Sequence, residues 1–275
     1  MQVKAANWFT ATIVPSAMLP YPPRFYLNPP SVRVGPYHNY EEYAEYIFNQ
    51  TTGTGESDLR EVDEYRFDIG TGLLRGLFWI SADEPVESLE GIPAWDEATV
   101  HVGLLRLETQ SPLGVTTGIV TNEEVAHFTS TRWVDPKGTS YVALNAEHLR
   151  RASTVVRLQV AQDLSLLIAD EHIAGWVLLN PARYLTHLWQ ELPATDDDEL
   201  GVILAEYLAL ACYPSLDDME PDNPESFQQL VSLYERLGGI SGDVGHRQVL
   251  RVYIDDLASR FFLKTVGGGP YPKRL

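Results

Sequence analysis

The chain of 275 residues is poor in cysteine and lysine, with Cys212 standing alone and only 4 lysines beside 16 arginines. A single cysteine cannot form an intramolecular disulfide, which agrees with a reducing compartment. No apolar run approaches the ~20 residues that a membrane-spanning helix needs. Aromatic and polar residues interrupt any apolar segment of a secretory signal near the N-terminus. We therefore expect a cytoplasmic protein that does not contact membranes.

The short motifs that mark common chemistries are missing as well. The seven histidines are scattered, whereas a zinc site usually takes two ligands from one short element. There is no G-x-S-x-G nucleophile motif, and Gly70 and Gly72 precede a predicted strand rather than the helix of a phosphate-binding loop. A basic stripe suited to nucleic acid is also absent. We predict no metal, no cofactor and no nucleic-acid partner.

Acidic charge, in contrast, is abundant. The 38 Asp and Glu residues outnumber the 20 Lys and Arg residues, giving a formal net charge of −18. Because 44% of the chain is hydrophobic and 11% aromatic, this acidity belongs to a folded protein and not to a disordered tail. Residues 191–225 contain eleven acids and no Lys or Arg. Such a surface repels nucleic acid and anionic lipid and attracts basic partners.

Hydrophobic periodicity predicts strands first and helices last. The expected strands lie at 8–14, 64–68, 74–81, 99–109, 115–120, 155–161, 164–169 and 173–179. Capping residues and apolar stripes predict helices after Asn39, from Thr121 to Phe128, after Asn180-Pro181, and at 200–213, 224–237 and 249–263. This order predicts an α+β fold in which a mostly antiparallel sheet packs with a C-terminal helical layer.

Composition suggests how the chain is organised. Residues 1–40 are rich in proline and aromatic residues and are expected to be an extended segment packed on the body. Residues 41–180 are expected to be an antiparallel, β-rich region with short helices. Residues 181–265 would form a helical region within the same domain, followed by a flexible tail at 266–275.

Two histidines are candidates for catalysis. His101 lies in a strand predicted to be central and covered on both faces, with Arg106 and Arg75 as expected neighbours. His172 follows two acids in a predicted turn. A satisfied histidine in the core or at an interface is the favoured explanation of His101, so a hydrolase built from these residues and sequence-distant carboxylates is an alternative and not the main hypothesis.

The main hypothesis is an acidic protein that neutralises or chaperones a basic protein partner, as immunity-type or antitoxin-type inhibitors do. Electrostatic steering would make such association fast and dependent on salt. The alternatives are a hydrolase, a scaffold subunit of a larger assembly, and charge that serves solubility alone. The expected partner-binding residues belong to the acid-only span: Asp196, Asp197, Asp198, Asp217, Asp218, Glu220 and Asp222.

Overall fold

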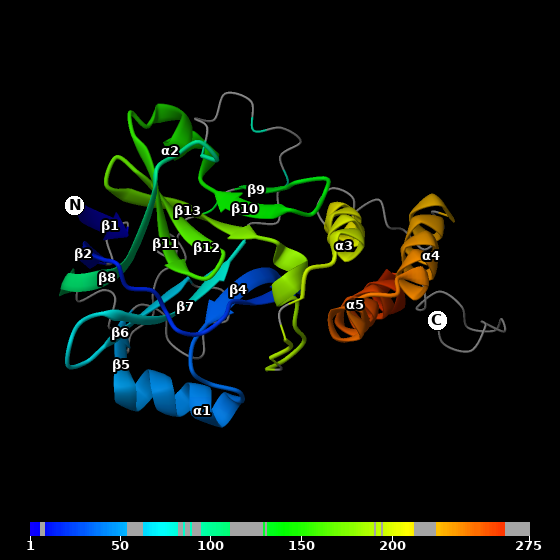
Figure 1. Ribbon diagram of the computed structural model, residues 1–275, viewed down its shortest axis with the longest axis horizontal. Coiled ribbons are helices and arrows are strands. Elements are labelled where there is room, and N and C mark those ends of the chain that lie inside the picture. Colours follow the sequence, from blue (N-terminus) through cyan, green and yellow to red (C-terminus); the bar gives the residue numbers. More distant parts are fainter. Residues whose placement is uncertain are drawn as a thin grey trace.

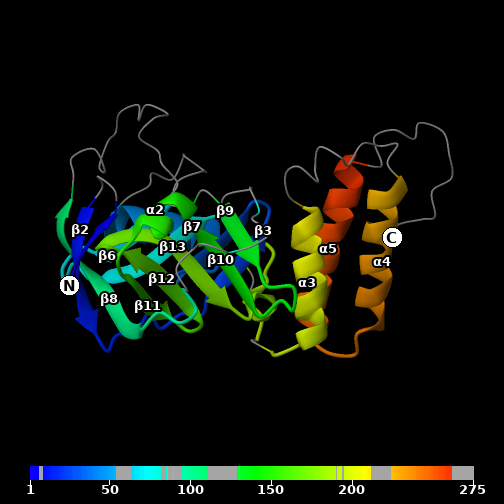
Figure 2. The same cartoon turned by 90° about the horizontal axis from the view of Figure 1, so that it is seen from above.

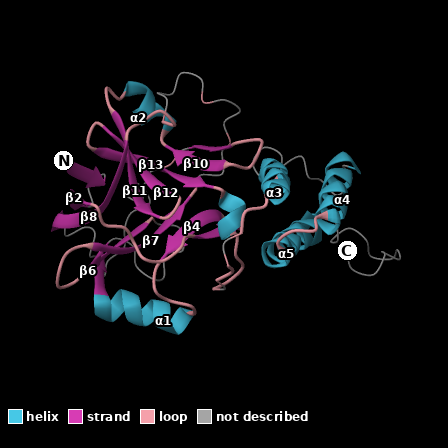
Figure 3. Cartoon of the chain, viewed as in Figure 1, coloured by secondary structure: helices cyan, strands magenta, loops and turns pink. Residues whose placement is uncertain are grey.

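A computed structural model shows two β-sheets beside a bundle of three helices (Figures 1 and 2). It describes residues 1–5, 9–53, 63–81, 85, 89, 95–110, 129, 131–189, 191–193, 195–211 and 224–261. Figure 3 shows strands gathered on one side of the molecule and the long helices on the other. Among the described residues, no helix is long and apolar enough to cross a membrane.

Six strands of the first sheet close into a barrel. Their order is β1-β2-β8-β11-β12-β13, and β1 also pairs with β13. The β8–β11 and β1–β13 pairings are parallel, while the other barrel pairings are antiparallel. Two further strands extend the sheet beyond β13. The bounds are β1 Gln2–Ala5, β2 Phe9–Pro15, β8 Val100–Gln110, β9 Thr131–Val134, β10 Ser140–Leu144, β11 Val155–Ala161, β12 Leu164–Ala169 and β13 His172–Leu179.

The second sheet has five strands in the order β3-β4-β7-β6-β5, all antiparallel. A helix capped by the Asn39 side chain, which accepts a hydrogen bond from the Glu42 backbone, connects β4 to β5. The bounds are β3 Arg24–Leu27, β4 Pro30–Val34, α1 Tyr40–Glu45 with a π-helical turn over Tyr46–Gln50, β5 Thr51–Gly53, β6 Glu64–Asp68 and β7 Leu74–Ile80.

Aromatic residues fill the space between the two sheets. The Trp176 indole of β13 stacks on Tyr141 of β10, with ring centroids 5.3 Å apart. Trp79 of β7 lies 6.5 Å from Trp176, and Phe25 of β3 meets the Tyr141 ring edge-on at 4.9 Å. All four side chains are at most 2% exposed. Burial of such large apolar groups makes this row of rings a main source of the free energy that holds the sheets together.

The helix bundle comprises α3 Asp198–Leu210, α4 Pro224–Gly239 and α5 Val244–Phe261, while the short α2 Ala146–Arg151 lies in the barrel region. Hydrogen bonds fasten the bundle to the sheets. The Arg132 side chain on β9 donates to the carbonyl oxygens of Leu208 and Ala211 at the end of α3, both at 3.0 Å. The Tyr253 hydroxyl on α5 donates to the Thr186 carbonyl at 3.0 Å. In addition, a single cluster of buried hydrophobic residues runs through both sheets and the bundle.

The α+β class is confirmed and most strand pairings are antiparallel, but a plain antiparallel sheet is wrong, because six strands form a mixed barrel. The connection from β8 to β11 returns the chain in parallel, and β1 reaches across to β13, which closes the barrel. Residues 1–40 supply β1 to β4 and so contribute to both sheets. The strand expected at 115–120 and the helix expected from Thr121 to Phe128 lie outside the described residues.

The helix expected after Asn180 is also wrong in its extent. Pro181–Tyr184 forms a single 3-10 turn, and Asn180 adopts a left-handed conformation with no side-chain cap. The Thr186 backbone N–H then donates to the Phe25 carbonyl at 2.9 Å, so this segment pairs with β3. Because an extended segment can pair with a strand edge and a helix cannot, tertiary pairing overrides the local helix signal.

Candidate functional site

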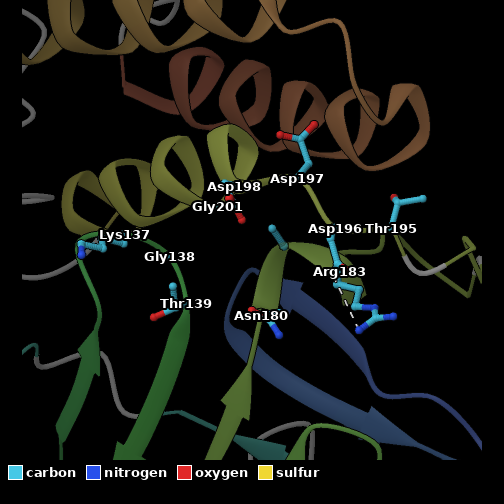
Figure 4. Close-up of a pocket in the computed structure, with 11 residues that line it drawn as sticks. Lys137, Gly138, Thr139, Asn180, Arg183, Thr195, Asp196, Asp197, Asp198 and Gly201 are labelled. Atoms are coloured by element: carbon cyan, nitrogen blue, oxygen red, sulfur yellow. Dashed lines mark ion pairs between the residues drawn. The ribbon is translucent and has the colours of Figure 1, made fainter.

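The candidate site is a polar hollow where the sheet meets the start of α3 (Figure 4). Its volume is about 340 Å³. It gathers the β9–β10 turn, the end of β13 with its 3-10 turn, and the N-terminus of α3. The lining residues are Lys137, Gly138, Thr139, Asn180, Ala182, Arg183, Thr195, Asp196, Asp197, Asp198 and Gly201.

Asp197 holds the helix and the hollow in place. Its carboxylate accepts a hydrogen bond from the Leu200 backbone N–H at 3.0 Å, as an N-cap does. The same carboxylate accepts from the backbone N–H of Asp243, at the turn before α5, at 3.3 Å. Figure 4 shows the Asp197 carboxylate turned toward the neighbouring helices, away from the strand ends below it. Asp197 therefore fixes the bundle rather than presenting a free charge.

Asp196 and Asp198 are exposed and differ in their partners. Asp196 lies 3.6 Å from the Arg183 guanidinium, which also lies 3.4 Å from the Asp163 carboxylate. Tyr184 donates to Asp163 at 2.6 Å, and burial together with this carboxylate raises the pKa of Tyr184. Arg183 is thus shared between two carboxylates. The first turn of α3 stabilises the charge of Asp198, because the helix dipole favours acids there.

Two glycines bring the β9–β10 turn against α3. Gly138 has a φ of +71°, and a Cβ atom added to it would overlap the backbone of Gly201. The Gly138 backbone N–H donates to the Asp135 carbonyl at 2.7 Å, which closes the turn. Only a residue without a side chain satisfies both requirements. The close approach of these two backbones forms the floor of the hollow.

Beside the hollow, the partly buried Asp243 and the buried His246 form a pair at the start of α5. The Asp243 carboxylate accepts hydrogen bonds from the Thr195 hydroxyl, the His246 ring and the backbone N–H groups of Gly245 and His246. Burial alone would raise the pKa of Asp243, but the hydrogen bonds from His246 and Gly245 outweigh it and lower the pKa. The pair joins the segment before α3 to the start of α5.

This arrangement predicts a pH-dependent contribution to stability. A carboxyl whose pKa is lower in the folded state than in the unfolded state stabilises the fold fully at pH values above its unfolded-state pKa, about 3.9. This contribution is lost as the pH falls through the folded-state pKa. Asp243→Asn should lower the free energy of unfolding by about 1 kcal/mol at pH 7, and this difference should close below about pH 4. Urea unfolding at pH 7, 5 and 3 measures it.

Asp255 provides the matched control, because burial raises its pKa although Arg251 opposes that shift. Its ionised form is the less favourable one in the folded protein, so Asp255→Asn should not destabilise the fold at pH 7. A difference for Asp243→Asn that stays constant down to pH 3 would contradict the assigned pKa direction.

The structure separates the two catalytic candidates from the hollow. His101 is exposed on β8, together with Val100 and Val102, and so the expected coverage of both strand faces is wrong at this end. Residues 100–102 pair with β11, whereas β2 pairs from Gly103 onward, so this end of β8 has a partner strand on one side only. Arg75, an expected neighbour of His101, instead lies 3.2 Å from Asp68.

His172 begins β13 and is half-buried. Its Nδ1 lies 3.0 Å from the Asp170 carbonyl oxygen, and its ring meets the His148 ring edge-on at 5.5 Å. The Asp170 carboxylate is engaged by the backbone N–H groups of Ser153 and Thr154. Within the described ranges, no group of three or more His, Cys, Asp or Glu residues is placed to hold a metal ion.

The remaining expected partner-binding residues, Asp217, Asp218, Glu220 and Asp222, lie outside the described residues. Sequence reasoning missed Arg183 and Thr139, which line the hollow with the three aspartates, and Asp163, which shares Arg183 with Asp196. Asp163 and Arg183 lie close to predicted strand ends, which is too common a signal to select them, and Thr139 precedes a strand, β10, that was not predicted from the sequence. The hollow offers carboxylate, hydroxyl and amide oxygens, which suit a cationic group.

Comparison with protein-family models, with curated protein sequences and with solved structures finds no match to this chain.

Proposed function

We propose that the protein is an acidic binding protein that neutralises or chaperones a basic protein partner, in the way of an immunity protein or antitoxin. The observation that supports this proposal is the pair of exposed carboxylates, Asp196 and Asp198, at a polar hollow of about 340 Å³. A hollow of this kind can receive the end of an arginine or lysine side chain from a partner. Guanidinium groups pair with carboxylates through two parallel hydrogen bonds.

The local charge favours a cation in the hollow. Asp196 and Asp198 line it together with Lys137 and Arg183, while the Asp197 carboxylate is engaged by backbone N–H groups. Arg183 already faces Asp163 as well as Asp196, so much of its charge is balanced outside the aspartate group. Thr139 and Asn180 add neutral hydrogen-bonding oxygens. An inserted basic side chain would find acceptors on several sides, which is the arrangement of an interface anchor.

The net charge of −18 acts at longer range. It would attract a basic protein before contact and raise the association rate, most strongly at low ionic strength. A fold that uses its acidity only for solubility needs no such local arrangement of carboxylates. The hydrolase and scaffold-subunit alternatives have no comparable observation in the described part of the chain to favour them.

The expected result of removing the two exposed charges is slower association. Partners captured from source lysate at low salt and eluted with a salt gradient would be identified by mass spectrometry. Binding kinetics of the purified basic partner should then show an association rate about tenfold lower for the double variant Asp196→Asn, Asp198→Asn at low ionic strength. Both substitutions keep the side-chain size and remove only charge.

The control is Glu41→Gln with Glu97→Gln, two exposed acids outside the hollow that remove the same net charge. This control should reduce the association rate by no more than about twofold. Equal effects of the two double variants would assign the acidity to general steering and reject the hollow as the contact. Recovery of no basic partner would reject the proposed function.

A further inference from the structure

A second hollow, lined by aromatic residues and Arg33 in place of a group of aspartates, lies between the five-stranded sheet and α5. Its volume is about 710 Å³, within the range of small-molecule sites. Strands β3, β4 and β7, the segment 187–189 and the outer face of α5 form its walls. The lining residues are Tyr26, Asn28, Pro29, Ser31, Arg33, Phe78, His187, Leu188, Trp189, Val252, Tyr253, Asp256 and Arg260.

Arg33 is the cation of this hollow, and aromatic rings surround it. Its guanidinium carbon lies 4.4 Å from the ring centre of Phe78, 4.7 Å from that of Trp189, 4.8 Å from that of Tyr43 and 5.8 Å from that of Tyr26. Ring faces attract the positive charge and let it be half-buried. They do not replace the oxygen acceptors that five guanidinium N–H groups require.

No carboxylate or carbonyl of the described chain supplies those acceptors. The Arg33 guanidinium has no ion pair within 4 Å and no hydrogen bond, and its Nε atom is buried without a partner. The buried Glu64 carboxylate is engaged elsewhere: the Tyr43 hydroxyl donates to its two oxygens at 2.7 and 2.8 Å, and Arg66 donates to it at 3.4 Å. Arg33 therefore keeps its hydrogen-bonding capacity.

Tyr26 adds a second unused donor to the same hollow. Its hydroxyl oxygen is buried and has no hydrogen-bond partner. Burial raises the pKa of Tyr26, although Arg33 opposes that shift, so the hydroxyl keeps its proton and remains a donor. A buried polar group without a partner carries a desolvation cost, and two of them lining one hollow point to a ligand that satisfies both.

The charge of the hollow indicates a singly charged anion. Arg260 lies 2.8 Å from the Asp256 carboxylate, so these two residues largely cancel each other. Arg33 then provides one net positive charge, which a carboxylate balances. A phosphate with nearly two negative charges would leave excess charge beside Asp256. Phe78 and Trp189 line the same hollow beside Arg33 and offer apolar ring surface for the rest of the ligand.

We propose that this hollow binds a small organic acid, with its carboxylate on the Arg33 guanidinium and the Tyr26 hydroxyl and a flat apolar body against Phe78 and Trp189. The proposal is independent of the basic protein partner, because the ligand has the opposite charge and occupies a different part of the molecule.

Titration calorimetry of the full chain with 2-naphthoate tests this inference, with 2-naphthamide and inorganic phosphate as the comparison probes. The carboxylate should bind at least about tenfold more tightly than the neutral amide, because it forms charge-assisted hydrogen bonds with Arg33. Phosphate should not compete. Equal binding of the acid and the amide, competition by phosphate, or no binding of the acid would overturn the proposal.

Tyr26→Phe is the most informative variant, because it removes only an oxygen that has no partner in the fold. It should leave the unfolding midpoint unchanged or raise it, while weakening 2-naphthoate binding about three- to tenfold. Tyr46→Phe is the matched control: the Tyr46 hydroxyl is also buried without a partner, but Tyr46 does not line the hollow. It should leave 2-naphthoate binding unchanged.

Arg33→Met keeps an apolar stem among the rings and should weaken 2-naphthoate binding at least tenfold, to about the affinity of the amide. Should Arg33→Met unfold, Tyr26→Phe and Tyr46→Phe still decide the question. The same affinity in both tyrosine variants would place the carboxylate elsewhere and reject the site.

Discussion

Replacing Gly138 with alanine is expected to lower the free energy of unfolding by about 3 kcal/mol. The left-handed backbone at a φ of +71° costs a residue with a side chain about 1–2 kcal/mol. The added Cβ would also overlap the Gly201 backbone, which cannot rotate away as a flexible side chain could. Forcing the turn away from α3 should add a similar cost. Urea unfolding followed by far-UV circular dichroism measures the change.

Gly238 is the matched control for this substitution. It lies near the end of α4, and a Cβ added there would meet nothing within 4 Å. Gly238→Ala should therefore keep the stability or raise it by about 0.5–1 kcal/mol, since alanine loses less conformational entropy than glycine in a helix. Equal stability of Gly138→Ala and the unsubstituted protein would contradict the tight contact between the turn and α3.

The second large loss in the free energy of unfolding is expected for Trp176→Ala. The indole is 2% exposed and packs between Tyr141 of the first sheet and Trp79 of the second. Its removal would leave a cavity where the sheets meet, and such substitutions cost about 3–5 kcal/mol. Because the Trp176 Nε1 has no hydrogen-bond partner, the loss would come from packing alone. Thermal unfolding and near-UV circular dichroism would report both stability and ring packing.

Trp133 on the edge strand β9 is the control for the second substitution. It is only partly buried and contacts Trp95 at 6.3 Å between ring centres. Trp133→Ala should cost less than half as much as Trp176→Ala, because its neighbours and solvent can fill the space. Similar losses for both would mean that the aromatic row between the sheets is not the main link between them.

Local sequence signals predicted the elements that depend on neighbours in the chain. The hairpin of β6 and β7 and the meander of β11, β12 and β13 are confirmed, because alternation and short turns specify adjacent antiparallel strands. Asn39 caps its helix as its position indicates, whereas α3 is capped by Asp197, one residue after the start of the acidic run. Helix α5 begins at Val244, five residues before the expected start, because Asp243 supplies a cap that the apolar stripe does not reveal.

Long-range pairing could not be predicted in the same way. Strands β3 and β4 contain or adjoin prolines, which weaken a strand signal, and they form because β7 and the Thr186 segment supply partners. The parallel pairing of β1 with β13 joins residues that no local pattern relates. Tertiary context, not propensity, decides such strands.

In the two hollows, too, the sequence indicates local features but not the contacts between distant parts of the chain. The run Asp196 to Asp198 is visible as charge, but only the structure reveals that Asp197 is engaged by backbone groups. The Arg33 hollow draws on β3, β4, β7, the 187–189 segment and α5, so its members are scattered over more than 200 positions of the sequence. A spatial cluster of this kind leaves no spacing that a motif could describe.

Closure of the barrel through β1 and β13 also constrains how the protein is made. During synthesis the ribosome releases residues 2–5 long before residues 172–179, which complete their pairing. Until then, β1 has only β2 beside it and exposes one edge to other nascent chains. Strand pairing over such a separation is slow, since loop closure must precede any gain in contacts. We expect newly made chains to depend on chaperones until β13 emerges, and expression at reduced temperature to raise the folded yield.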